Sequence, residues 1–225
     1  VVKAHYRHAK TIVVDTGGAI VAVEWVRLQL DLAAFDDDQF APYLRKCEQS
    51  GIEFTTLGDL GDSSANRRAL YQLNKMCSAD IPERGEFYTF EEYLTDRIES
   101  PTYDPLGVVL ALSDGVWVGM ATTSLHPVQG YAFSEMTVVL ASHRGQDLSL
   151  AMKLLAIRFA RSRGMRWLRT FHHPDNARAS GMNRRMEAIA AAPHVLTSRP
   201  TPITQYAQQP SLPLQRPCAR ARASR

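Results

Sequence analysis

A strand, a short polar loop and a long amphipathic helix follow one another in the second half of this 225-residue chain, and they constrain its fold more than any other feature. The strand is predicted over Ala132–Leu140, which combines β-branched and aromatic residues. The helix is predicted over Leu148–Arg163, because Leu150, Leu154 and Ile157 recur at helical spacing. Each element is apolar on one side, so the two must pack into a core of sheet and helix.

Strands and helices alternate through the rest of residues 51–186. Strands are predicted at Ile52–Leu57, Gly107–Leu112, Val116–Ser124 and Trp167–Phe171, and helices at Ser64–Ser78, Thr89–Ser100 and Asn176–Met186. The first of these helices carries Leu70, Leu73 and Met76 on its expected buried face. With a hairpin signal at Asp114-Gly115, the alternation predicts an α/β (α+β) fold with a central mixed sheet flanked by helices.

Composition divides the chain into three parts. In residues 1–50, the runs Thr11–Val14 and Ala19–Val26 predict a hairpin, and Phe35–Gln49 predicts a short helix within a connector. Residues 51–186 hold the main domain. Residues 187–225 contain six of the 12 prolines and no sustained apolar period, which predicts a disordered tail.

The positive charge of the chain comes from this tail. The formal net charge is +3, but five arginines and one glutamate give residues 187–225 a charge of +4 and leave residues 1–186 at −1. A nucleic-acid partner is therefore not favoured for the folded part.

Several other classes are also disfavoured. No apolar run approaches the ~20 residues that cross a bilayer, and the start of the sequence lacks the pattern of a secretory signal. The three cysteines fit neither a disulfide framework nor a zinc site, and the adjacent His172 and His173 point apart on a strand, so no metal is expected. We expect a cytoplasmic protein without a membrane partner.

The loop before the long helix is the first candidate for chemistry. A helix N-terminus presents unpaired N–H groups and the positive end of a dipole, which suits a phosphate. Arg144 adds a planar cation that matches phosphate geometry. A simple turn with an exposed arginine would have the same sequence, so both interpretations stay open at this point.

Residues 135–146, with the sequence EMTVVLASHRGQ, are similar to the fourth strand and the start of the pyrophosphate loop in the Gcn5-related N-acetyltransferase (GNAT) superfamily. The long helix, the next strand and the Asn176 segment follow in that family's order and spacing. Leu30–Asp36 resembles the connector of bacterial proteins with two such domains in tandem, and the chain is similar to their C-terminal repeat. The resemblance covers about Val23–Met186.

This resemblance implies a GNAT-type acyl-CoA N-acyltransferase fold and a bacterial enzyme. The enzyme would move an acetyl group directly from acetyl-CoA, as co-substrate, to an amine on a small molecule or peptide. Residues 1–50 would be the remnant of a preceding repeat, and the chain would form a homodimer or pack with another GNAT repeat. The family's two closing strands would have to come from the segment after Met186, whose sequence does not predict them.

The resemblance also implies site residues. Thr137, Val138 and Val139 would lie against the pantetheine arm, and Asn176 would lie beside its acetyl end. The pyrophosphate would be wrapped by a run of six residues: Arg144, Gly145, Gln146, Asp147, Leu148 and Ser149.

Glu135 lies where family members often place a general base. An amine with a pKa near 10.4 must lose a proton before it can attack a thioester, and a carboxylate can take that proton. The alternative is a carboxylate that only pairs with a surface arginine.

Two residues depart from the family pattern and keep other functions open. Asp147 stands where the loop usually has glycine, so it would either bring a negative charge to the pyrophosphate or cap the helix. Asn183 stands where a tyrosine often protonates the departing thiolate. A catalytically idle CoA-binding domain and a truncated product without function are therefore the alternatives to an enzyme.

Overall fold

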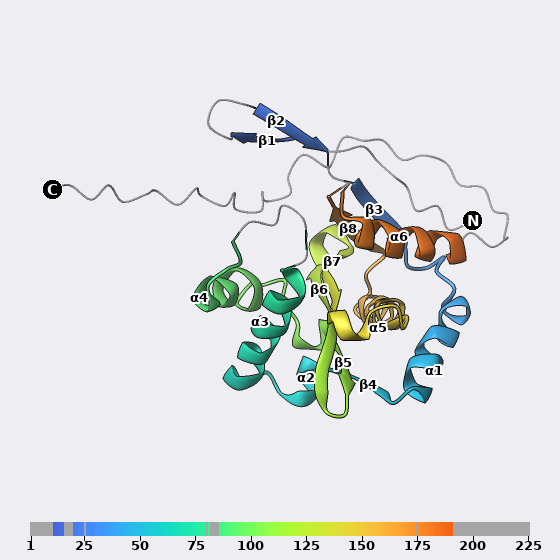
Figure 1. The fold of residues 1–225 in the computed structure, drawn as a ribbon. Helices are drawn as coiled ribbons and strands as arrows, with labels where there is room; N and C mark the ends of the chain where they lie inside the picture. Colours follow the sequence, from blue (N-terminus) through green and yellow to red (C-terminus); the bar gives the residue numbers. More distant parts are fainter. Residues whose placement is uncertain are drawn as a thin grey trace. The chain divides into compact units, whose positions relative to one another are not determined.

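The computed structural model describes residues 11–15, 20–24, 26–79, 81, 86–173 and 175–190. Its centre is a six-stranded sheet in the order β3-β8-β7-β6-β5-β4 (Figure 1). The strands are β3 (Val26–Asp31), β4 (Ile52–Thr56), β5 (Val108–Ser113), β6 (Val116–His126), β7 (Tyr131–Val139) and β8 (Trp167–His172). Neighbouring strands are antiparallel except β7 and β8, which are parallel. The predicted mixed sheet is confirmed.

Helices cover both faces of this sheet (Figure 1). One face carries α3 (Ser64–Ser78) and α4 (Phe90–Tyr93), and the other carries α1 (Ala41–Gln49), α5 (Leu148–Ser162) and α6 (Ala177–Ala190). The short helix α2 (Leu57–Leu60) follows β4 directly. A separate two-stranded sheet pairs β1 (Thr11–Asp15) with β2 (Ile20–Glu24), which confirms the predicted hairpin.

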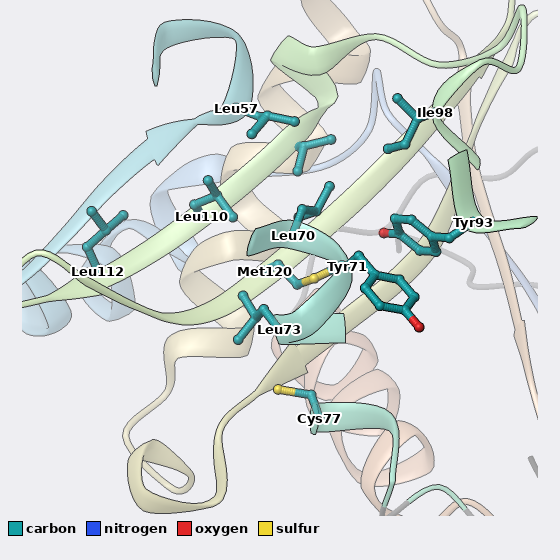
Figure 2. Packing of buried hydrophobic residues seen from close by; sticks show 11 residues of the cluster. Leu57, Leu70, Tyr71, Leu73, Cys77, Tyr93, Ile98, Leu110, Leu112 and Met120 are labelled. Atoms are coloured by element: carbon teal, nitrogen blue, oxygen red, sulfur yellow. The ribbon is translucent and has the colours of Figure 1, made fainter. Parts of the chain in front are cut away.

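The α3 face of the sheet is filled by a cluster that Figure 2 shows from close by. Leu70 and Leu73 of α3 pack against Leu110 of β5 and Met120 of β6, and all four are almost fully buried. Met76 was expected on the same helix face but is 57% exposed, because the buried face runs through Leu70, Leu73 and Cys77 instead.

The α5 face of the sheet is also covered by a buried apolar cluster. Leu150, Leu154 and Ile157 of α5 are fully buried, as the helical spacing predicts, and Leu32 and Phe40 from the connector pack against them. The long helix and the connector therefore share one core.

Two elements differ from their predictions. Strand β3 was not predicted, and its pairing with β8 makes part of the segment before residue 51 an edge of the main sheet. Thr89 and Glu92 form a capping box at the start of the helix predicted over Thr89–Ser100, but the regular helix ends at Tyr93 and continues as a π-helical turn, η2 (Leu94–Ile98). Of the predicted tail, residues 187–190 continue α6 and residues 191–225 lie outside the described residues.

Gly107 offers a test of how tightly the sheet and α5 are packed. A Cβ atom there would lie 2.6 Å from the carbonyl oxygen of Thr123 and 2.7 Å from the ring of Phe159. We predict that Gly107→Ala lowers the free energy of unfolding by about 1–3 kcal/mol, because backbone atoms cannot move aside. Urea unfolding measures the change.

Gly181 in α6 is the matched control, since a Cβ atom there meets nothing within 4 Å. Gly181→Ala should leave the protein equally or more stable, because alanine favours helix. Equal losses in the two variants would contradict the packing argument.

Candidate active site

Strands β7 and β8 separate after only a short stretch of pairing. Their parallel register covers Tyr131, Ala132 and Phe133 on β7, opposite Trp167, Leu168 and Arg169 on β8. From Ser134 onward, β7 continues to Val139 without a ladder partner on that side. The side-chain hydroxyl of Thr170 donates to the Ser134 carbonyl oxygen at 3.1 Å, so a side chain replaces the backbone hydrogen bond of a continued ladder. We call the space between the diverging strands the split.

The backbone of β7 faces the split at alternate residues. The Leu140 N–H donates to Val118 at 2.8 Å, so the backbone groups of Val138 and Leu140 point to β6. Those of Thr137 and Val139 point to the split. Of the three strand residues predicted to contact a pantetheine arm, Thr137 and Val139 therefore offer backbone groups, and Val138 does not.

The loop between β7 and α5 presents a row of backbone donors. Gly145 and Gln146 are exposed, Gly145 has a φ of +78°, and Asp147 also lies in the left-handed region with a φ of +66°. N–H groups in the first turn of a helix have no intrahelical partner. Within the described part of the chain, no acceptor takes the N–H groups of residues 145–149. The loop can therefore bind an anion through Gly145, Gln146, Asp147, Leu148 and Ser149.

Asp147 does not cap α5, which corrects the capping interpretation. It makes no side-chain bond to the helix N-terminus. Its carboxylate accepts from Lys46 of α1 at 2.8 Å and from Arg185 of α6 at 2.7 Å, and only 7% of the side chain is exposed. Lys46 and Arg185 thus neutralise the negative charge of Asp147. The Asp147 backbone has the left-handed conformation that glycine favours.

Burial raises the pKa of Asp147, but the hydrogen bonds and positive charges of Lys46 and Arg185 outweigh it and hold the pKa below its usual value. Two further bonds hold the loop in place. Arg144 Nε donates to the Val139 carbonyl at 3.1 Å, and the buried Cys47 Sγ lies 3.4 Å from the Gln146 carbonyl.

Glu135 is the extra residue of a β-bulge. Thr122 pairs with Met136 and Thr123 with Ser134, which leaves Glu135 without a partner on β6. A bulge bends its strand and redirects a side chain. It turns Glu135 into a pocket on the α3 side of the sheet, whereas Ser134 faces α5 on the other side.

The Glu135 carboxylate has two hydrogen-bond donors beside it. It accepts from Ser124 at 2.6 Å and from Arg97 of η2 at 3.1 Å, and Arg97 also donates to the Tyr88 hydroxyl at 3.0 Å. The carboxylate remains 28% exposed, so an incoming group can reach it. It is therefore paired with an arginine, as the alternative interpretation stated, and also open to the pocket.

His126 lies behind this carboxylate. Its Nε2 is 3.3 Å from the Ser124 hydroxyl, and its ring stacks on Tyr131. Burial lowers the pKa of His126, although the charge of Glu135 raises it. A neutral imidazole is thus available one hydroxyl away from Glu135.

The pocket is lined by both polar and apolar groups. Residues of α3, η2, β6 and β7 surround it, with Asn74, Asp96, Arg97, Ser124 and Glu135 as the main polar members. It suits a hydrophilic ligand that carries both donors and charge.

The two asparagines lie on α6 or just before it. The Asn176 side-chain oxygen accepts from the Ala179 N–H at 3.0 Å and so caps α6. Asn183 is buried at 7% exposure. Within the described residues, no three His, Cys, Asp or Glu side chains converge to hold a metal ion, and no described helix is long and apolar enough to cross a membrane.

Comparisons with known proteins show which family the chain belongs to. The model of a family described as acetyltransferase (GNAT) family matches residues 67–186, more than half of the chain. Two curated proteins named mycothiol acetyltransferase are similar to it. The one from Frankia casuarinae is 31% identical over 125 residues, 51% of this chain and 36% of its own length. The one from Cellulomonas flavigena is 28% identical over 169 residues, 68% of this chain and 47% of its own length.

A solved structure supports the fold. The aminoglycoside acetyltransferase meta-AAC0020 from an uncultured soil metagenomic sample, in complex with sisomicin, has a TM-score of 0.50 at 12% identity. The match covers 69% of this chain and 98% of that one. The chain belongs to the acetyltransferase (GNAT) family. It spans about half or less of the length of the curated relatives it matches.

Sequence reasoning missed the partners of both carboxylates. Arg97 and Ser124 meet Glu135 only because η2 and β6 are folded against β7, and Lys46 and Arg185 reach Asp147 from two other helices. No local pattern marks these residues. Arg144 was found because a strand and a helix frame its loop, and Glu135 and Asp147 were found through the family resemblance.

The ion pairs of Asp147 can be tested through pH. A carboxylate whose pKa is lowered by folding stabilises the protein above its unfolded pKa, and this contribution is lost as the pH falls through the folded value. We predict that Asp147→Gly is less stable than the parent at neutral pH, and that the difference narrows below about pH 4. Urea unfolding at a series of pH values measures it.

Asp114 provides a matched control, because it also has a positive φ but makes no ion pair within the described residues. Asp114→Gly should show no such narrowing. The ion-pair argument fails if both variants follow the same pH curve.

Proposed function

We propose that this chain is an acetyl-CoA-dependent N-acetyltransferase domain that transfers the acetyl group directly to an amine. The observation that carries the proposal is the position of Glu135. It follows Ser134, where β7 and β8 begin to separate, and it faces the pocket on the opposite side of the sheet. A donor in the split and an acceptor in the pocket would therefore meet at this point of β7.

The residues present fit acetyl-CoA. The backbone groups of Thr137 and the N–H of Val139, whose carbonyl accepts from Arg144, can bond the amide-rich arm, as an added strand would. The N–H row of residues 145–149, together with Arg144, can bind the pyrophosphate. The Thr137 hydroxyl is buried without a partner among the described residues, so a polar ligand in the split would satisfy it.

Glu135 would act on the acceptor. An ammonium entering the pocket can give its proton to the carboxylate, and the neutral amine can then attack the thioester carbonyl that acetyl-CoA supplies. Arg97 and Ser124 hold the carboxylate in one orientation while its exposed edge faces the acceptor.

We propose a hydrophilic acceptor, either a small molecule or a peptide. The pocket contains both the carboxylate of Glu135 and the guanidinium of Arg97, which suits an amine that also bears hydroxyl or anionic groups. The names of the similar proteins suggest two compounds for a first panel: the acceptor of mycothiol acetyltransferases, and sisomicin.

The matched relatives are longer than this chain, and the connector resembles that of tandem domains. We therefore propose that the domain works beside a second GNAT repeat or as a homodimer, in the cytoplasm of a bacterium.

The second candidate function is a CoA-binding domain without catalytic activity, favoured by Asn183 in the place of the usual tyrosine. Calorimetry with acetyl-CoA, followed by thiol release with the acceptor panel, tests the proposal, and no binding at millimolar ligand would overturn it.

The pyrophosphate loop gives a sharper prediction. Arg144→Gln should weaken CoA binding about ten- to a hundredfold, because one charge-assisted bond of about 1.5–3 kcal/mol is lost. Binding of pantetheine, which has no pyrophosphate, should not change. A similar loss for both ligands would place Arg144 elsewhere in the site.

Glu135 gives the catalytic prediction. Glu135→Gln should reduce turnover about 100-fold or more, because an amide cannot accept the acceptor's proton. Acetyl-CoA affinity should stay the same by calorimetry. Glu91→Gln, at an exposed position of α4, is the control and should keep full turnover. Unchanged turnover in Glu135→Gln would remove it from this role.

A further inference from the structure

A lysine lies inside the apolar core between α5 and the sheet. Lys153 is only 4% exposed, in the same helix as the fully buried Leu150 and Leu154. Its ammonium donates to the hydroxyl of Ser134 on β7. Among the described residues, that hydroxyl is its sole polar partner, and no carboxylate pairs with it.

Such a group is costly to bury. An ammonium has three donors, and two of those on Lys153 have no acceptor in the described part of the chain. Burial lowers the pKa of Lys153 to about 8, so the side chain is still mostly charged at neutral pH. A buried charge without a counter-ion destabilises a fold. Packing therefore does not explain why a lysine stands here.

The position of Lys153 connects it to the split. Ser134 is the first residue of β7 beyond the last pair with β8, and its carbonyl is held by Thr170. Further along β7, Met136 and Val138 pack toward α3, so Thr137 between them faces α5. The hydroxyl of Thr137 is buried and has no partner among the described residues. Three donors thus lie on the α5 side of β7, along the part of the strand that borders the split: Lys153, Ser134 and Thr137.

These donors are complementary to an anion that arrives in the split. We propose that Lys153, with Ser134 and Thr137, forms a binding site for the sulfur of CoA and stabilises it as a thiolate when the acetyl group leaves. The inference rests on the proposed function, because it assigns a group to the leaving end of the same donor. Because the sulfur leaves as a stabilised thiolate, the reaction does not need an acid in place of the tyrosine that Asn183 replaces.

The charges balance in this step. The acceptor ammonium loses one proton to Glu135 and its nitrogen attacks the carbonyl carbon; a second proton leaves as the amide forms, also through Glu135 to solvent. The carbon–sulfur bond breaks and its electron pair stays on sulfur, beside the Lys153 ammonium. The thiolate takes a proton from water after it leaves the site. A thiol with a pKa near 8.5 is mainly protonated in neutral solution, so a thiolate found at neutral pH identifies CoA that is bound in this site.

The test uses reduced CoA and the full chain at neutral pH. Ultraviolet absorbance detects thiolate, and titration of the protein with CoA should give a thiolate signal that free CoA lacks. Desulfo-CoA should bind without the signal. Lys153→Met, which keeps the length and apolar stem of the side chain, should bind CoA but lose the signal. Its turnover should fall about 100-fold, as when an oxyanion donor is removed.

Stability provides an independent readout. Because Lys153→Met removes an unpaired buried charge, its melting temperature should equal or exceed that of the parent. Ser134→Ala is a second variant and should reduce the thiolate signal without unfolding the protein. Lys75→Met, on the exposed side of α3, is the matched control and should change neither signal nor turnover.

The possible failures can be told apart. If CoA does not bind at all, the proposed function fails. If CoA binds and turnover is normal but no thiolate appears, or if Lys153→Met keeps the signal, the sulfur site is wrong. If succinyl-CoA binds more tightly than acetyl-CoA in the parent and not in Lys153→Met, the ammonium pairs with an acyl carboxylate instead, and the inference is also overturned.

Discussion

The structure depends on the early end of pairing between β7 and β8. A parallel ladder that stops after Phe133 and Arg169 leaves backbone donors and acceptors of β7 unpaired in the middle of a protein, which is unfavourable unless something else bonds them. Side chains replace part of the missing hydrogen bonds, since Thr170 donates to the Ser134 carbonyl and Arg144 donates to the Val139 carbonyl. The groups that remain border the split, and the loop, the bulge at Glu135 and Lys153 are all positioned around it.

The loop shows how a fold can tolerate a residue that its backbone conformation disfavours. Asp147 has the left-handed geometry that glycine adopts without strain, yet its carboxylate is held by Lys46 and Arg185 from two helices. These bonds tie α1, α5 and α6 together at the mouth of the split. Asp147 thus adds tertiary ion pairs that a glycine at this position could not make. Its side chain does not bond the N–H groups of residues 145–149, so these stay available to a ligand.

Much of the fold could be predicted because its signals are local. The hairpin at Asp114, the capping box at Thr89 and the helical spacing of α5 each depend on neighbours within one or two turns. Strand β3 could not, since it is defined only by pairing with β8 some 140 residues later. The same holds for the site: Glu135 and Asp147 could be identified, but Lys46 lies 101 residues from the aspartate it pairs with. Lys153 did have a local signal, as the one charge within an otherwise apolar stretch of α5.

The three buried or half-buried charges near the split differ in what they can do. Asp147 is paired twice and almost closed to solvent, so its role is structural. Glu135 shares Arg97 with Tyr88 and keeps an exposed edge on the α3 side. Lys153 has a charge without a counter-ion and reaches Ser134 from the α5 side. Of two consecutive residues of β7, Glu135 therefore places a base on one side of the sheet, and Ser134 contacts an unpaired cation on the other. An acyl transfer can use both groups, because the nucleophile must lose a proton and the leaving group gains negative charge.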